Sequence, residues 1–130
     1  MLEIHNEHPD KLLHRATTET IIGAAFEVHQ ELGYGFLERV YQRALQVELI
    51  RRGVAAEIER RIQVQYKGVV VGDYDADLIV ADSVAVEIKV NPQYKRDEAQ
   101  LLNELKATGL KVGLLINFGR NKVEYKRLVF

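Results

Sequence analysis

The stretch DYDADLIVADSVAVEIKVNP, from Asp73 to Pro92, decides the fold of this chain. In its second half Val and Ile alternate with small or charged residues, which is the two-residue period of a β-strand. A strand this apolar is expected near the middle of a sheet. Glu87 and Lys89 nevertheless leave one face of it, about 7 Å apart along the strand, and Asp75 and Asp77 have the same spacing on the segment before. The sequence therefore places charged groups in the middle of a predicted sheet.

Two helices are predicted before this stretch. From Thr17 to Leu32 apolar residues recur at helical spacing, after a Thr-Thr-Glu start that would cap the first turn. Gly33 ends this helix, and the elbow GYGF leads into a second one from about Glu38 to Arg52. The two helices together predict a helical hairpin.

Strands and one more helix make up the rest of the chain. After Gly53 the period changes from 3.6 to 2, and EIERRIQVQY and VVVGDYDADLIV read as antiparallel strands joined at Lys67-Gly68. Asn91-Pro92 closes the strand of Glu87, and a third helix follows from about Tyr94 to Ala107. LKVGLLINF and NKVEYKRLVF then read as two further strands.

The order of these elements predicts the fold class. The order is helix, helix, three strands, helix, strand, strand. Because the third helix connects the strand of Glu87 to the next strand, these two strands are expected to be parallel and joined by a right-handed crossover. We therefore predict an α/β fold with a mixed sheet flanked by helices.

Composition bounds the class of protein. The 130 residues fit a single domain over 1–130, with residues 1–16 expected as a loosely ordered N-terminal segment. The net charge of -1 gives no global basic signature, so any contact with nucleic acid would come from a local patch. The absence of cysteine excludes a disulfide framework and thiolate zinc sites. No signal peptide or membrane span is recognisable, and a cytoplasmic protein without membrane contact is expected.

The turn between the two charged strands decides whether Asp77 stands opposite Glu87. Pairing Val80 with Val84 around a three-residue turn opposes them, whereas a two-residue turn would oppose Leu78 to Glu87. We expect the three-residue turn or a bulge. The two carboxylates would then lie about 5 Å apart at Cβ, which is destabilising unless a cation lies between them.

A hard divalent cation would remove this cost. Mg²⁺ takes oxygen ligands and keeps several waters, so two carboxylates suffice, and a lysine beside it would orient a water or stabilise charge on a phosphate. The alternative is structural: Glu87 and Lys89 form an ion pair on a half-solvated strand, while Asp75 and Asp77 follow the Gly72 bend into solvent. Short motifs of this kind also occur by chance. On a strand covered on both faces, however, charged side chains without a function or partner cost stability.

These residues resemble a known family. Asp77, then Glu87-Ile88-Lys89 on the next strand, followed by a helix and a strand, is similar to the signature of the PD-(D/E)XK nuclease superfamily, whose core is restriction-endonuclease-like. The elbow GFLERVY, with Gly35, Glu38 and Tyr41 at G-x-x-E-x-x-Y spacing, resembles the group named GxxExxY proteins. EVHQELGYGFLERVY and GLLINFG extend the likeness over nearly the whole chain.

The resemblance implies a divalent-metal-dependent nuclease that hydrolyses phosphodiester bonds of DNA rather than RNA. Asp77 and Glu87 would hold Mg²⁺ or Mn²⁺, and Lys89 would assist the hydrolytic water. Glu38 would complete the metal site, and Gln100 on the third helix would order the site or bind substrate. From the residues alone, a glutamate that only favours the start of its helix explains Glu38 equally well.

Two positions depart from the family pattern. Ala76 stands where the superfamily name has proline, which is a minor change. Glu104, four residues after Gln100, stands where related sequences often carry tyrosine. This exchange adds negative charge near a site expected to bind phosphate.

The start of the third helix carries candidate residues for binding nucleic acid. Lys95 and Arg96 begin the third helix, where backbone N–H groups also favour phosphate, and they would bind nucleic acid or simply form a solvated face. A catalytically silent nucleic-acid-binding or protein-interaction module on the same fold is the alternative to a nuclease. A homodimer is compatible with a domain of this size.

Overall fold

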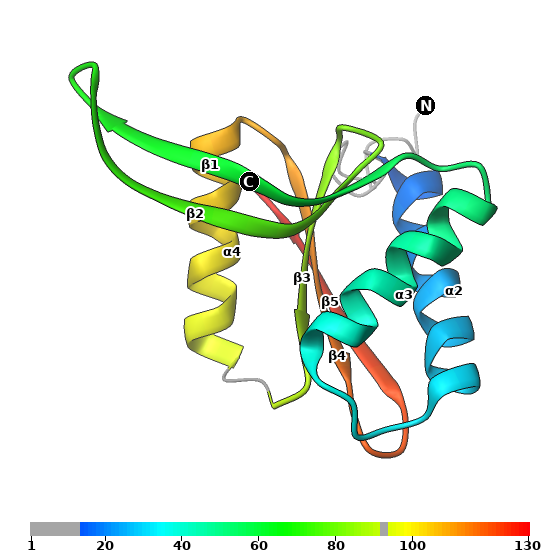
Figure 1. Ribbon diagram of the computed structural model, residues 1–130. Coiled ribbons are helices and arrows are strands. Elements are labelled where there is room, and N and C mark those ends of the chain that lie inside the picture. The colour runs from blue at the N-terminus through cyan, green and yellow to red at the C-terminus, as the bar shows by residue number, and fades with distance from the viewer. Residues whose placement is uncertain (1–13, 92–93) are drawn as a thin grey trace, which may run out of the picture.

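The computed structural model describes residues 14–91 and 94–130, which form one sheet with helices on both of its faces (Figure 1). The elements follow the predicted order. They are α2 Arg15–Leu32, α3 Glu38–Arg51, β1 Ala56–Tyr66, β2 Val69–Val80, β3 Val84–Lys89, α4 Tyr94–Thr108, β4 Val112–Phe118 and β5 Val123–Val129.

The sheet has five strands in the order β1-β2-β3-β4-β5. β3 and β4 run parallel and are joined through α4, while every other neighbouring pair is antiparallel. The predicted α/β class with a mixed sheet is therefore confirmed. β3 lies at the centre of the sheet, as its apolar alternation requires.

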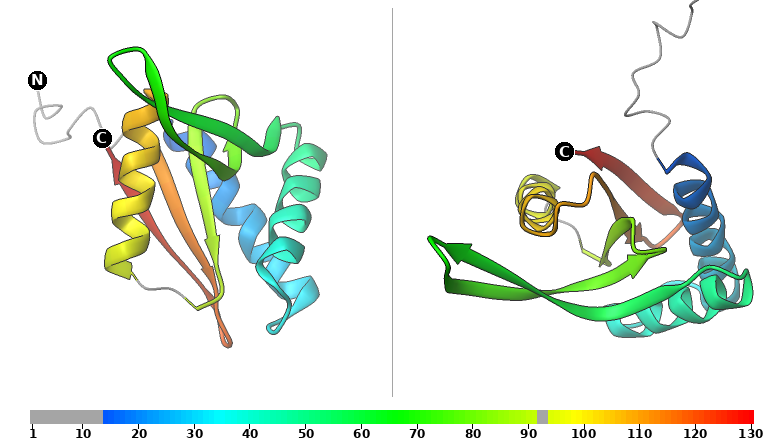
Figure 2. Two further views of the ribbon diagram at one scale, coloured as in Figure 1. Left: turned by 60° about the vertical axis from the view of Figure 1, so that its left-hand side comes forward. Right: turned by 90° about the horizontal axis from the view of Figure 1, so that it is seen from above.

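Each face of the sheet has its own core. Val84, Val86 and Ile88 of β3 pack with α2 and α3, and they are fully buried. Ala85, on the other parity, packs with Leu101 and Leu105 of α4. Figure 2 shows α4 on one side of the central strands and the pair α2 and α3 on the other. The same alternation sends the side chains of residues 87 and 89 toward α4.

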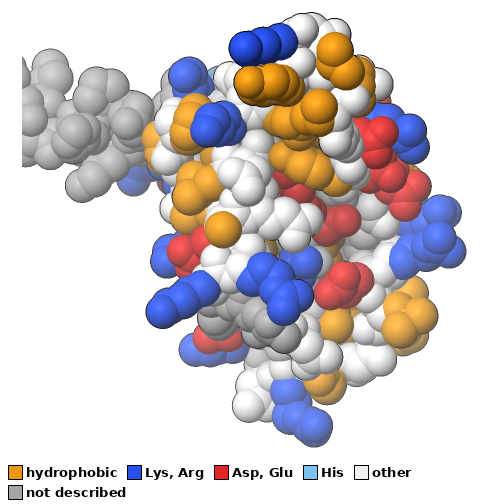
Figure 3. Space-filling model, turned by 90° about the vertical axis from the view of Figure 1, so that its left-hand side faces the viewer, with side chains coloured by type: hydrophobic (Ala, Val, Ile, Leu, Met, Phe, Trp, Pro, Cys, Tyr) orange, Lys and Arg blue, Asp and Glu red, His pale blue; other side chains and the backbone are white. Residues whose placement is uncertain are grey.

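The β1–β2 hairpin extends beyond the body of the molecule, past α4 (Figure 1). Its tip exposes Tyr66 and the run Val69 to Val71. In Figure 3, which faces this tip, hydrophobic side chains gather at the top of the surface, and acidic side chains lie below them between Lys and Arg side chains.

The start of α2 differs from the prediction. The helix begins at Arg15, with His14 as its N-cap in a left-handed conformation (φ 55°) and without a capping side-chain hydrogen bond. The predicted Thr cap is therefore wrong: the Thr18 hydroxyl donates to the Arg15 carbonyl inside the helix. Most of the N-terminal segment predicted to be loose, residues 1–13, lies outside the described residues. No helix among the described residues is long and apolar enough to cross a bilayer.

Candidate active site

The candidate site lies where β2 separates from β3. The two strands pair from Val80↔Val84 to Leu78↔Val86, and the ladder ends there. The turn between them has three residues, two of which, Ala81 and Asp82, adopt left-handed φ of 52°. This register is the one expected from the three-residue turn, and it brings Asp77 beside Glu87.

Side chains replace the backbone ladder at this fork. The Ile88 N–H donates to Asp77 Oδ2 at 2.8 Å, and the Asp77 N–H points at Glu87 Oε2 at 3.4 Å. On the other side, Gln42 Nε2 of α3 donates to the Asp77 carbonyl at 2.9 Å. The two carboxylates are thus fixed by backbone groups of each other's strands, and the place of Asp77 is fixed from α3 as well.

Burial makes both carboxyl groups unusually weak acids. Glu87 is 4% exposed. Burial, followed by the neighbouring Glu87 charge, raises the pKa of Asp77 to about 7. Burial, followed by the carboxyl group of Glu104, raises the pKa of Glu87 to about 9. Without a cation, the cluster therefore retains protons near neutral pH.

Glu104 is a third carboxyl group in this cluster. It is fully buried on α4, and neither of its oxygens meets a hydrogen-bond donor in good geometry. Burial raises its pKa and so does the charge of Asp77, whereas Gln100 and Lys89 oppose the increase. Because a carboxylate donates no hydrogen, Glu87 and Glu104 can bond to each other only by sharing a proton.

Lys89 is held by an acidic residue that the sequence did not single out. Its Nζ lies 3.7 Å from Oδ1 of Asp97 in the first turn of α4, and Asp97 is 6% exposed. The ammonium also lowers the pKa of Asp77, although burial and Glu87 dominate there. The Lys89 ammonium therefore lies between the carboxyl cluster and the first turn of α4.

Glu38 reaches the site from the opposite side. It is the first residue of α3, after the N-cap Leu37. With Asp77 and Gln42 it lines a small cavity of about 200 Å³, to which Arg39 and Glu59 also contribute. The structure thus places Glu38 and Asp77 on one cavity.

Other charged residues stay outside the cluster. Asp75 points to solvent beside Arg61, with 3.6 Å between its Oδ1 and the Arg61 Nε, so it does not share the environment of Asp77. Lys95 and Arg96 are exposed in the first turn of α4 and form no ion pair with another described residue.

Sequence reasoning missed three participants. Gln42 stands four residues after Glu38, so helical spacing places both on one side of α3, and this spacing was the available signal. Asp97 directly follows the basic pair Lys95 and Arg96 at the start of α4, and no sequence pattern gave it a role. Glu59, in a left-handed conformation (φ 55°), lies across from Asp77 in the gap between two β1–β2 pairs, and no sequence signal marks it.

The donor set fits a hard divalent cation. No three His, Cys, Asp or Glu side chains among the described residues already form a metal-binding cage. Asp77 and Glu87 do supply two adjacent carboxylates whose repulsion a cation would relieve, and Mg²⁺ needs only one or two carboxylates with waters and substrate oxygens. The raised pKa values of both groups are the expected electrostatic sign of such a site.

Comparisons with known proteins give one family and two solved structures. One family model, described as PD-(D/E)XK nuclease superfamily, matches residues 15–128. The crystal structure of SSO0001 aligns over 86% of this chain and 64% of its own, less than two thirds of its length, with 15% identity and a TM-score of 0.46. An alkaline exonuclease (LHK-Exo) from Laribacter hongkongensis aligns over 85% of this chain and 81% of its own, with 12% identity and a TM-score of 0.42. None of the curated proteins matches the chain.

Proposed function

This chain belongs to the PD-(D/E)XK nuclease superfamily, and from that membership we propose that it hydrolyses phosphodiester bonds of DNA, rather than RNA, with Mg²⁺ or Mn²⁺. The observation that carries the proposal is the fork between β2 and β3, where the buried carboxyl groups of Asp77 and Glu87 meet within reach of the Lys89 charge. Residues 1–130 act as one domain in this proposal.

We assign the roles of the residues within this proposal from the family resemblance, and their positions are compatible with these roles. Asp77 and Glu87 hold the metal, and Glu38 completes its surroundings from the shared cavity. A bound divalent ion lowers the pKa of its water and neutralises phosphate oxygens. The Lys89 ammonium, oriented by Asp97, stabilises the negative charge that develops on the phosphoryl group.

Residues of α4 support the site and bind the substrate in this proposal. Gln100, next to Glu104 on α4, orders the cluster from the side of the helix. Lys95 and Arg96 offer charge to the phosphate backbone at the start of α4, where the helix dipole also favours anions.

Membership in the GxxExxY group is part of the same proposal. Tyr41, the last residue of that motif, is fully buried, and its hydroxyl donates to the Gly33 carbonyl at 2.6 Å. The motif thus has a structural role in shaping the elbow before α3, and it places Glu38 at the cavity.

A catalytically silent binding module is the second candidate, favoured by one observation. The buried Glu104 offers its carboxyl group to Glu87, so a shared proton can settle the cluster without any metal. This version predicts salt-dependent binding of nucleic acid without turnover.

The deciding experiment is cleavage of labelled single- and double-stranded DNA and RNA in Mg²⁺ and in Mn²⁺. Wild type is compared with Lys89→Ala and with Lys67→Ala, which removes a lysine at the hairpin tip. We expect Lys89→Ala to lose at least about 100-fold in turnover, because charge stabilisation in the transition state is lost, and Lys67→Ala to keep it.

Circular dichroism and thermal melting show whether each variant is folded. Equal cleavage by wild type and Lys89→Ala would assign the activity to a contaminant. No cleavage by the wild type, with binding retained, would select the silent module.

A further inference from the structure

Three neighbouring cavities share lining residues in pairs and run from the β4–β5 turn to Asp77, and we refer to them together as the groove. The first, about 520 Å³, lies along the elbow from Tyr34 to Arg39 and reaches Asn91 at the end of β3. The second, about 380 Å³, shares Tyr34 and Asn91 and continues to the β4–β5 turn at residues 119–122. The small cavity of Asp77 shares Glu38 and Arg39 with the first. The groove therefore passes Val90 and Asn91, which directly follow Lys89 at the end of β3.

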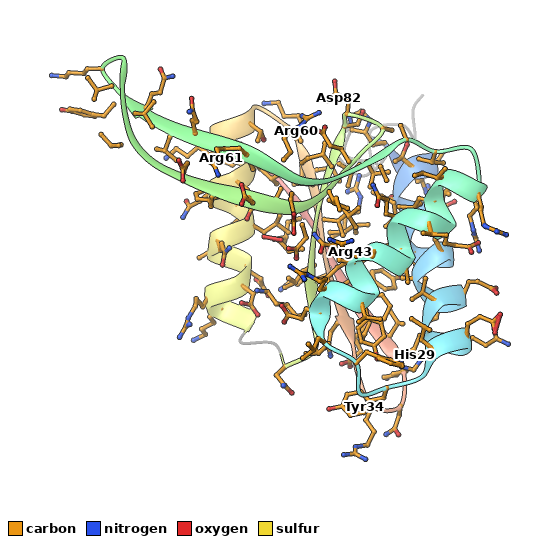
Figure 4. The ribbon with its side chains drawn as sticks, in the orientation of Figure 1. His29, Tyr34, Arg43, Arg60, Arg61 and Asp82 are labelled. Carbon is orange, nitrogen blue, oxygen red and sulfur yellow. The ribbon has the colours of Figure 1, made fainter. Side chains whose placement is uncertain are left out.

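The groove combines exposed rings with cations. Tyr34 is 42% exposed, and the Arg120 guanidinium lies over its ring at 5.2 Å. Tyr34 lies beside the β4–β5 turn, at the end of the molecule opposite Arg60 and Arg61 (Figure 4). Phe36, the next aromatic residue of the elbow, is also about half-exposed.

The elbow that carries Tyr34 is held in place. Gly33 and Gly35 adopt positive φ of 73° and 116°, which residues with a Cβ rarely adopt. The buried Tyr41 hydroxyl accepts from the Phe36 N–H at 3.3 Å and donates to the Gly33 carbonyl. The Tyr34 ring is therefore presented outward from a fixed backbone, with no packing in the core to account for it.

Cations of the groove differ from those of the hairpin. Arg60 is engaged by Glu57 and Asp82, each at 2.8 Å. By contrast, Arg120 and Lys122 form no ion pair with any other described residue. The charge that remains available for phosphates is thus next to the exposed rings.

We propose that this groove binds a single strand of nucleic acid and leads it to Asp77, with a base stacked on Tyr34 and phosphates at Arg120 and Lys122. Single-strand sites join a cationic track to aromatic platforms on which bases stack. A duplex hides the faces of its bases and would leave the Tyr34 ring unused. The inference rests on the proposed nuclease function, because it supplies the substrate path to the same carboxylates.

The test measures binding without cleavage. Fluorescence anisotropy of labelled oligothymidine, oligouridine and a DNA duplex is recorded for the full chain in EDTA. The same measurement is repeated in Mg²⁺ with each protein carrying Lys89→Gln, so that the oligonucleotides are not cleaved. The variants are Tyr34→Ala, Tyr34→Phe and Arg120→Ala. The matched control is Tyr66→Ala, because Tyr66 is also an exposed tyrosine under a cation, Lys67 at 5.4 Å, but lies at the hairpin tip.

We expect Tyr34→Ala to weaken single-strand binding at least about fivefold, the lower end of one lost base stack. Tyr34→Phe should restore it, and Tyr66→Ala should leave it unchanged. Arg120→Ala should lower the slope of log K against log salt by about 0.7, which is one phosphate contact. Oligothymidine and oligouridine distinguish DNA from RNA as the source of the strand.

The proposal that the groove binds a single strand would be contradicted by equal single-strand affinities of Tyr34→Ala, Tyr66→Ala and wild type. Tighter binding of the duplex than of the single strands would contradict it as well. If cleavage that depends on Lys89 persists in that case, the proposed function stands and only the path of the strand is wrong. If Tyr34-dependent binding occurs without cleavage by the wild type, the groove stands and the nuclease function fails.

Discussion

A buried glutamate on a central strand is costly unless something compensates its charge. Glu87 accepts a weak contact from the Asp77 N–H, and the carboxyl groups of Asp77 and Glu104 lie close to it. Glu104 is in a worse position, because neither of its oxygens has a donor in good hydrogen-bond geometry. Buried acceptors without partners are normally avoided, so their presence at the fork indicates a site that is completed by a cation or by protons.

Glu104→Gln should therefore stabilise the metal-free protein. The amide carries no charge at any pH and can donate to Glu87, so we expect the free energy of unfolding at pH 8 in EDTA to rise by about 1–2 kcal/mol. Urea denaturation measures it. Glu98→Gln on the same helix is the control, because it only removes an exposed ion pair with Lys126 and should change stability by less than about 0.5 kcal/mol. A loss of stability in Glu104→Gln would show that the Glu104 charge is compensated.

Strands and helices were predictable here because their patterns are local. The apolar alternation of residues 84–90 fixed β3, and the three-residue turn fixed its pairing with β2. The position of Asp77 beside Glu87 followed from that register. Asp75, two residues before Asp77, lies beside Arg61 instead, because the pairing of β2 with β3 does not extend to that residue.

Contacts between elements were less predictable. The burial of Glu104 against Glu87 depends on how α4 packs over β3, which no local pattern encodes. The bond from Gln42 to the Asp77 carbonyl depends in the same way on the packing of α3. The likeness in sequence to related proteins suggested roles for the site residues and placed the Glu104 charge near the site, but it did not give the contact of Glu104 with Glu87 or the bond from Gln42.

The elbow between α2 and α3 depends on one hydroxyl group. Tyr41 stacks on Phe118 at 4.5 Å and bonds to both Gly33 and Phe36. Tyr41→Phe keeps the ring and leaves two elbow groups without their partner, so we expect a loss of about 1–2 kcal/mol in the free energy of unfolding. Urea denaturation measures it against Tyr125→Phe, in which an exposed tyrosine of β5 changes. Equal stability of the two variants would mean that water replaces the hydroxyl.

The molecule as a whole brings the fork, the end of β3 and the elbow to one side. β2 pairs with β3 only between Leu78 and Val80, so Asp77 is the first residue of β2 beyond this ladder. The groove along the elbow enters the same region through Glu38 and Arg39. Shared lining residues thus link the cavity at Asp77 to the exposed rings and cations of the elbow and the β4–β5 turn.

The carboxyl cluster should make the stability of the metal-free protein fall as pH rises. The pKa of Asp77 is raised to about 7 and that of Glu87 to about 9, so the folded state binds more protons than the unfolded state above their ordinary values of 3.8 and 4.5. Stability therefore decreases as pH rises between about 4 and 7 for Asp77, and up to about 9 for Glu87. Each group contributes at most about 1.4 kcal/mol per pH unit.

Urea denaturation in EDTA at pH values of about 5, 6.5 and 8 measures this slope, which Mg²⁺ should oppose because it binds the ionised carboxylates of the folded state. A hundredfold excess of Mg²⁺ over its Kd would add about 2.7 kcal/mol at the higher pH. Asp77→Asn keeps an acceptor for the Ile88 N–H and should flatten the slope below pH 7. A metal-free protein that grows more stable from pH 5 to 8 would mean that these carboxylates ionise without cost, and the electrostatic reason for a cation at the fork would disappear.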